Sequence, residues 1–203
     1  MTAHSVDPAL RERLLEAAYE CVARYGLGKT TVEDVVKQSG VSRATVYRAF
    51  PGGKDELLRA AVGWEMGRFF GRLAEAVAGS ADFASLVERG LQFAHDAVRD
   101  HAVLQKVLVA EPEKLLPLLT TEQERPLEFI TAFLLPYLER ERSAGRVVDG
   151  VDLATSAGFV ARMILSLITS PGSWDLDDPA QVHAVVREQV LAGIIVPDDL
   201  SAR

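Results

Sequence analysis

Apolar residues recur at a spacing of three and four along most of this 203-residue chain, and no stretch alternates apolar and polar residues as a strand would. The pattern is clear in Pro8–Tyr25, where an apolar series runs from Leu10 to Tyr25. Because a helix places residues of this spacing on one side, each such face needs a partner to cover it. The chain is therefore predicted to be all-α.

Glycine and proline residues divide the pattern into separate helices. After the N-terminal region, the predicted helices are Asp55–Val77, Phe83–Arg99, Ala102–Ala110, a brief piece between Pro112 and Pro117, Pro126–Ser143, Val151–Ser170 and a last helix that Asp178 caps and Pro179 begins. With 48% hydrophobic residues, a chain of this length can bury a sizeable core. We expect these helices to pack as a bundle.

Residues 30–50, TTVEDVVKQSGVSRATVYRAF, have the pattern of two short helices joined at a glycine. Thr30 or Thr31 can cap the first helix, because an acidic residue stands three positions after each of them. Gly40 can take the positive φ that ends this helix, and Ser42 is a suitable N-cap for the next. The segment therefore predicts a helix-turn-helix.

The second of these helices separates apolar from polar side chains. Val46 and Phe50 lie four residues apart and are expected to face inward. The outward set is Arg43, Thr45, Tyr47 and Arg48. A helix of this kind fits the DNA major groove, where its N-terminal residues approach base edges and its positive dipole end favours phosphate. The alternative is an ordinary helical corner with a solvated basic surface.

The charge distribution is compatible with a DNA-binding N-terminal region. Residues 1–63 hold nine Lys and Arg against eight Asp and Glu, whereas the remaining residues hold thirteen against twenty-one, and the net charge is −7. Specific binding needs only a local basic face. The residues that could form one are Arg11, Arg13, Lys29, Lys37, Arg43, Arg48 and Lys54. A solvated surface of mixed charge is the alternative.

Three motifs resemble the TetR family of bacterial transcription regulators: YGLGKTTVEDV, GVSRATVYRAF and the KDELL that begins at Lys54. The resemblance implies a helix-turn-helix DNA-binding domain in residues 1–54 and a helical domain for effector binding and dimerisation in residues 55–203. The chain departs from the family pattern in having three residues rather than two between Phe50 and Lys54. It also has Ala49 where an aromatic or histidine is usual, and Val36 where a small alanine is usual.

The resemblance and the helix pattern together assign expected roles to side chains. Base readout is expected of Arg43, Ala44 and Thr45, with Arg43 reading a guanine edge. Contacts to the DNA backbone are expected of Thr31, Ser42, Tyr47, Arg48 and Lys54.

The helices Pro126–Ser143 and Val151–Ser170 are the expected homodimer surface, because each carries a broad apolar stripe and the family pairs such helices around a two-fold axis. Intramolecular core packing is the alternative. An effector pocket is expected beside Pro136, since proline kinks a helix and can open space. The expected lining residues are Phe93, Phe129, Phe133 and Tyr137, for which core packing is again the alternative.

Other classes of protein find less support in the sequence. It contains no glycine-rich phosphate loop, paired-histidine metal motif or nucleophile elbow, and Cys21 is its single cysteine. We therefore expect no catalytic residues, metal or cofactor. We also expect neither a signal peptide nor a membrane segment, and hence a cytoplasmic protein.

The sequence thus predicts a ligand-responsive repressor. It would bind a pseudo-palindromic double-stranded operator as a homodimer and be released by a small apolar or amphipathic effector. One alternative is a helical small-molecule-binding or protein-interaction module whose DNA-binding corner has degenerated, as the departures at Ala49 and before Lys54 suggest. Another is an all-α enzyme acting in an apolar cavity.

Overall fold

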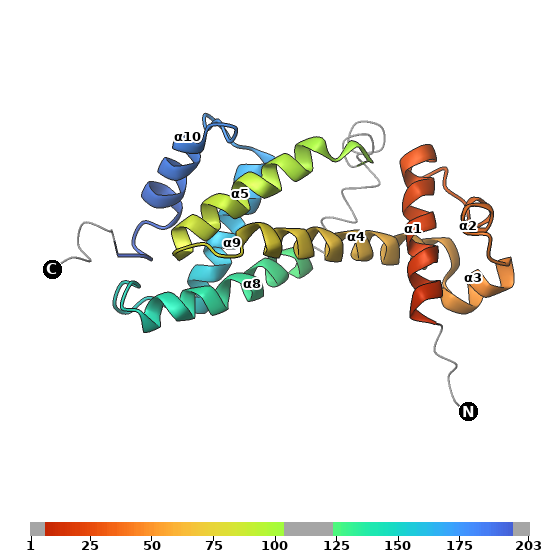
Figure 1. Cartoon of the computed structure of the whole chain (residues 1–203), viewed down its shortest axis with the longest axis horizontal. Helices are drawn as coiled ribbons and strands as arrows, with labels where there is room; N and C mark the ends of the chain where they lie inside the picture. Colours follow the sequence, from red (N-terminus) through yellow and green to blue (C-terminus); the bar gives the residue numbers. More distant parts are fainter. Residues whose placement is uncertain (1–6, 104–123, 197–203) are drawn as a thin grey trace, which may run out of the picture. The chain divides into compact units, whose positions relative to one another are not determined.

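The protein is described by a computed structural model, which covers residues 7–103 and 124–196. Its regular elements in these ranges are helices, shown in Figure 1. They are α1 (Pro8–Tyr25), α2 (Val32–Ser39), α3 (Arg43–Ala49), α4 (Gly53–Val77), α5 (Phe83–Asp100), α8 (Glu124–Ser143), α9 (Leu153–Thr169), α10 (Pro179–Ala184) and the π-helical turn η1 (Val185–Val190). The prediction of an all-α fold is confirmed.

Most predicted helix boundaries agree with the structure to within two residues. Helix α1 has the predicted bounds, whereas α4 begins two residues earlier than predicted, at Gly53. Helix α9 begins at Leu153, because the side chain of Asp152 accepts a hydrogen bond from the Thr155 N–H and caps it. The predicted helix Ala102–Ala110 extends beyond the described residues, and the piece between Pro112 and Pro117 lies wholly outside them.

The described residues form two compact units. The first contains residues 7–72 and 100–103, and the second contains residues 73–99 and 124–196. Helix α4 contributes to both, since the division falls between Arg72 and Leu73. The functional boundary expected at residue 54 remains a prediction.

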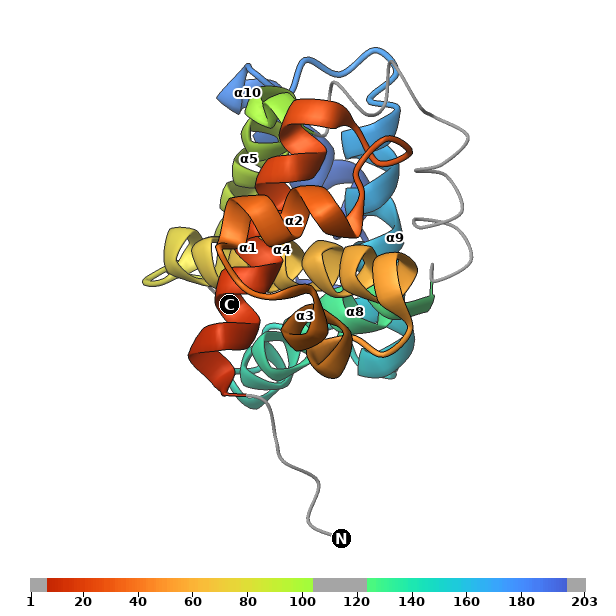
Figure 2. The ribbon, with the colours of Figure 1, turned by 90° about the vertical axis from the view of Figure 1, so that its right-hand side faces the viewer.

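The first unit packs α1, α2 and α3 with the start of α4, and Figure 2 shows its three N-terminal helices. Its fully buried apolar side chains come from all four helices and from the residue after α3; the largest are Leu14, Val35, Val46, Phe50 and Leu57. Cys21 belongs to the same core, as a small apolar residue would. This core fixes which face of α3 remains exposed.

Gly40 ends α2 in the left-handed conformation, with φ +67°, and its N–H donates to the Val36 carbonyl at 3.0 Å. A Cβ at this position would also meet the Arg13 guanidinium at 3.3 Å. We therefore expect Gly40→Ala to destabilise the first unit by about 1–2 kcal/mol, because an L-residue is strained there. The matched control is Gly67→Ala in α4, where a Cβ would meet nothing within 4 Å, and which should stabilise by about 0.5–1 kcal/mol.

Urea unfolding followed by tryptophan fluorescence measures both changes. The chain has two tryptophans, so a Trp174→Phe background leaves Trp64, which packs against the first unit's core, as the reporter. Equal midpoints for Gly40→Ala and its parent would contradict the expected strain.

The second unit has its core among α5, α8, α9, α10 and η1, with α8 packed along α9. Its most buried large side chains include Phe83, Leu91, Leu138 and Val160. Outside the helices, the Val148 N–H donates to the Ile194 carbonyl at 3.0 Å, which joins the connection after α8 to the residues after η1. No helix in the described part of the chain has the length and apolar composition that crossing a membrane requires.

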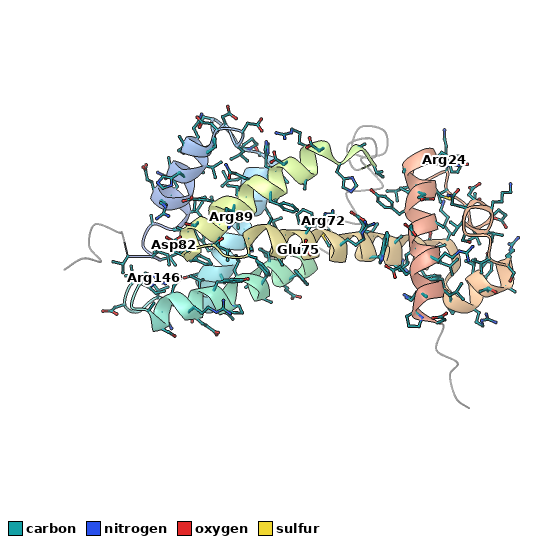
Figure 3. All side chains as sticks on the ribbon, viewed as in Figure 1. Arg24, Arg72, Glu75, Asp82, Arg89 and Arg146 are labelled. Atoms are coloured by element: carbon teal, nitrogen blue, oxygen red, sulfur yellow. The ribbon has the colours of Figure 1, made fainter. Side chains whose placement is uncertain are left out.

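Ion pairs and a side-chain hydrogen bond join helices of this unit to their surroundings, and Figure 3 labels three of the residues involved, Asp82, Arg89 and Arg146. Arg146 contacts the buried Glu141 at 2.6 Å, and Arg187 contacts Glu88 at 2.8 Å and Asp82 at 3.6 Å. Arg89 donates to the Ala78 carbonyl at 3.2 Å, which ties α5 to the turn after α4.

Candidate nucleic-acid interface

Helix α2 is capped at its N-terminus by Thr31 and Asp34. The Thr31 hydroxyl oxygen accepts from the Asp34 N–H at 3.2 Å, and the Thr31 N–H donates to the Asp34 carboxylate at 2.9 Å. The hydroxyl also donates to this carboxylate at 2.6 Å, and these bonds from Thr31 lower the pKa of Asp34. The neighbouring Thr30 is buried and donates its hydroxyl to the Gly26 carbonyl at 2.7 Å. Of the two predicted caps, Thr31 is the one the structure contains.

Helix α3 begins at Ser42, as predicted. Its Oγ accepts from the Thr45 N–H at 3.2 Å and lies 2.9 Å from the Thr45 hydroxyl oxygen. Val46 and Phe50 are fully buried, so the inward face is the predicted one. The outward side chains are the exposed Arg43, Ala44, Tyr47 and Arg48 and the half-buried Thr45. The three residues expected to read bases thus occupy the first turn of α3.

Arg43 has two partners within the protein. Its Nη1 lies 2.6 Å from a carboxylate oxygen of Glu33 on α2, and its guanidinium carbon lies 5.5 Å from the centre of the Tyr47 ring. A hydrogen bond with Tyr47 and the charge of Glu33 raise the pKa of Arg43. The sequence marked Glu33 only as an acid near a cap, because no local pattern shows that α2 and α3 bring these residues together.

Two of the predicted basic residues bind backbone oxygens. Lys54 Nζ donates to the Gly28 carbonyl at 2.8 Å, which fastens the first turn of α4 to the loop between α1 and α2. Arg11 Nη1 donates to the Ala49 carbonyl at 3.4 Å, and its guanidinium carbon lies 4.5 Å from the centre of the Phe50 ring. An ammonium group has three donors, so a phosphate contact of Lys54 remains a prediction.

The additional residue between α3 and α4 is accommodated by a turn at Gly53. This glycine has φ +68°, donates its N–H to the Phe50 carbonyl at 2.9 Å and already belongs to α4. A Cβ there would lie 3.4 Å from the Tyr47 ring. Ala49 is buried, so its small side chain belongs to the packed face of α3 rather than to the exposed one. The second departure from the family pattern is thus inside the core.

The two helices expected to dimerise pack against each other in one chain, and their apolar side chains divide into two groups. Leu134 and Leu138 belong to the intramolecular core. Phe129 on α8 and Phe159 on α9 are instead 50% and 46% exposed. The predicted stripes therefore lie partly in the core and partly on the exposed surface.

The residues expected to line an effector pocket have different surroundings. Phe133 and Tyr137 pack against the core of the second unit with ring centres 5.4 Å apart, Phe93 is half-buried and Phe129 is exposed. An open depression at Pro136 is lined by Pro136, Glu139, Arg140, Ser143 and Ala144. None of the four predicted aromatic residues lines this depression, and the effector pocket remains a prediction.

Titratable side chains of the described ranges do not gather into a metal site, since no three of His, Cys, Asp or Glu there are placed to hold an ion. The described histidines have separate partners. His95 lies 3.6 Å from Asp177, and His183 lies 3.2 Å from Glu88. His101 Nε2 lies 3.4 Å from the Tyr19 hydroxyl.

Comparison with known proteins places the helix-turn-helix in a family. The family profile described as "Bacterial regulatory proteins, tetR family" matches residues 14–61. An uncharacterized HTH-type transcriptional regulator of Mycobacterium tuberculosis is 46% identical over 39 residues, which are 19% of this chain and 21% of the relative. The HTH-type transcriptional regulator BetI of Stenotrophomonas maltophilia is 36% identical over 78 residues, 38% of this chain and 37% of BetI. The matches thus span well under half of these curated relatives.

Solved structures match nearly the whole chain. One, described as the molecular basis for control of antibiotic production by bacterial hormones, has a TM-score of 0.62 at 25% identity and covers 94% of this chain and 100% of its own. SmeT, the repressor of the Stenotrophomonas maltophilia multidrug efflux pump SmeDEF, has a TM-score of 0.59 at 20% identity, with 97% and 93% covered. The helix-turn-helix within residues 14–61 is therefore that of the tetR family of bacterial regulatory proteins.

Proposed function

We propose that the protein is a ligand-responsive transcriptional repressor that binds a pseudo-palindromic operator as a homodimer. The observation that carries this proposal is the construction of α3. Its apolar side chains Val46 and Phe50 are fully buried, whereas its first turn exposes Arg43 and Ala44 beside the Ser42 cap. A helix with a fixed inner face and polar groups at its exposed N-terminal turn is what major-groove reading requires. A regulator of this kind would act in the cytoplasm, where the operator lies.

Within this function, the side chains of residues 1–54 divide into two roles. Arg43, Ala44 and Thr45 lie at the start of α3 and would contact base edges. Thr31, Ser42, Tyr47, Arg48 and Lys54 would hold phosphates and fix the register of the helix on the duplex. Both Tyr47 and Arg48 are exposed, which supports this role.

The dimer would form through α8 and α9. Phe129 and Phe159 support this surface, because both are large apolar side chains that the chain leaves about half exposed. Two-fold pairing of residues 55–203 would present two copies of α3 to successive major-groove faces, whereas one copy alone would bind weakly.

Effector control would follow from differential binding to two states of the dimer. SmeT, which shares the fold, has been solved as a complex with triclosan, and this supports a small apolar or amphipathic effector here. Such a ligand must favour the state whose two α3 helices do not match the operator. A tenfold preference for that state would weaken the DNA complex by about 1.4 kcal/mol.

Selection of bound sequences from a random duplex pool tests the function as a whole. At about 150 mM salt, purely electrostatic binding is suppressed, so we expect the folded protein to enrich an inverted repeat. Recovery of unrelated sequences, with no repeat in either the presence or absence of candidate effectors, would contradict DNA regulation. That result would favour the helical binding module with a degenerate corner.

A further inference from the structure

We propose that Glu33 is a positioning residue that controls how strongly Arg43 discriminates between operator and unrelated DNA. This inference rests on the proposed function, since it assigns a further residue to the same interface. It starts from the 2.6 Å ion pair between Arg43 and Glu33, which joins the first turn of α2 to the first turn of α3.

Arg43 is held from two sides. Glu33 contacts Nη1, and the ring of Tyr47, one helical turn further along α3, lies beside the guanidinium. A guanidinium has five N–H donors in a fixed plane, so one edge can stay on a carboxylate while another reads the O6 and N7 of guanine. Arg43 can therefore keep Glu33 while it reads a base.

Unrelated DNA presents a different demand. Where no guanine edge is available, the same free edge of Arg43 can bind a phosphate, and this brings a negative charge close to Glu33. The phosphate and the Glu33 carboxylate then repel each other, whereas a guanine edge carries no net charge. Both side chains are exposed, at 64% for Arg43 and 53% for Glu33, so a DNA duplex can approach the pair. Glu33 thus opposes phosphate-only binding more than it opposes base reading.

A simpler role for Glu33 would be to stabilise α2, because an acid in the first turn interacts favourably with the helix dipole. The capping bonds of α2, however, are made by Asp34 with Thr31 rather than by Glu33. Removing the Glu33 charge should therefore leave the melting temperature nearly unchanged while it alters discrimination between DNA sequences. These two readouts separate the two roles.

The test compares binding of the full chain to a selected operator and to a scrambled duplex by fluorescence anisotropy. For Glu33→Gln, we expect tighter binding to the scrambled duplex and a specificity ratio about tenfold lower than wild type, the size of one lost base contact. The control is Glu16→Gln, which removes an exposed charge from α1 and should leave the ratio unchanged. Circular dichroism melting verifies that each variant is folded.

A double-mutant cycle shows whether the effect passes through Arg43. In an Arg43→Ala background, Glu33→Gln should leave the specificity ratio unchanged. An unaltered ratio in Glu33→Gln alone, or the same drop with and without Arg43, would overturn the inference while wild-type operator selection still supports the proposed function. A wild type that does not distinguish the two duplexes would refute both.

Discussion

Replacing Arg43 with alanine is expected to relax sequence preference at one base pair in each half-site of the operator. The side chain lies in the first exposed turn of α3, where base edges come within reach, and it can bind guanine through two parallel N–H groups. Loss of the side chain should weaken binding by about 1–3 kcal/mol when the operator carries the preferred base at this position. Binding to operators with other bases there should weaken much less. Competition binding with operators that vary at single positions measures this difference.

Arg48→Ala is the matched control, because Arg48 is also an exposed arginine of α3 but lies in its last turn. It should weaken binding to every sequence about equally and reduce the slope of log K against log salt by about 1. Lys54→Ala should act in the same way. This variant also loses the hydrogen bond to the Gly28 carbonyl, so its melting temperature has to be measured together with its DNA affinity. Equal losses on all sequences for Arg43→Ala and Arg48→Ala would refute the division of roles.

Phe159→Arg is expected to convert the proposed dimer into monomers. It should also weaken operator binding by about 100-fold or more, because two linked DNA-binding domains gain a factor of about 10²–10⁴ in affinity over one. Phe159 is 46% exposed in the single chain, so the substitution should leave the fold intact. In a two-fold interface each change occurs twice, and burying a phenylalanine contributes about 1.5–3 kcal/mol. Sedimentation velocity gives the oligomeric state, and anisotropy gives the operator affinity.

Val148→Arg provides the control for this experiment. Val148 is also apolar and 36% exposed, but it lies in the connection between α8 and α9 rather than on the proposed surface. It should leave both the dimer and the operator affinity unchanged. A wild type that sediments as a monomer, or a Phe159→Arg variant that remains dimeric, would show that α8 and α9 do not form the interface.

Local physics explains why much of the helix-turn-helix could be predicted. The capping threonine, the left-handed Gly40, the Ser42 cap and the inward pair Val46 and Phe50 all depend on residues within four positions of one another. Local spacing therefore contained them. The choice between Thr30 and Thr31 needed the structure, because both stand three residues before an acid.

Contacts between helices could not be predicted in the same way. Glu33 meets Arg43, Lys54 meets Gly28 and Arg11 meets Ala49 only because helices from distant positions pack at particular rotations. A helical period gives the direction of a face but not the residue that lies opposite it. For this reason the sequence assigned Lys54 to phosphate and did not identify its carbonyl partner.

The residue pattern was enough to predict the all-α class, the position of the helix-turn-helix and the side of α3 that faces outward, since these follow from periodicity and capping chemistry. The pattern could not show that Leu134 and Leu138 are core while Phe129 and Phe159 remain exposed, because all four lie on apolar helices. Burial depends on which surfaces meet in space. An apolar stripe shows that a face must be covered, and the packing of the whole chain decides which part is left for a partner.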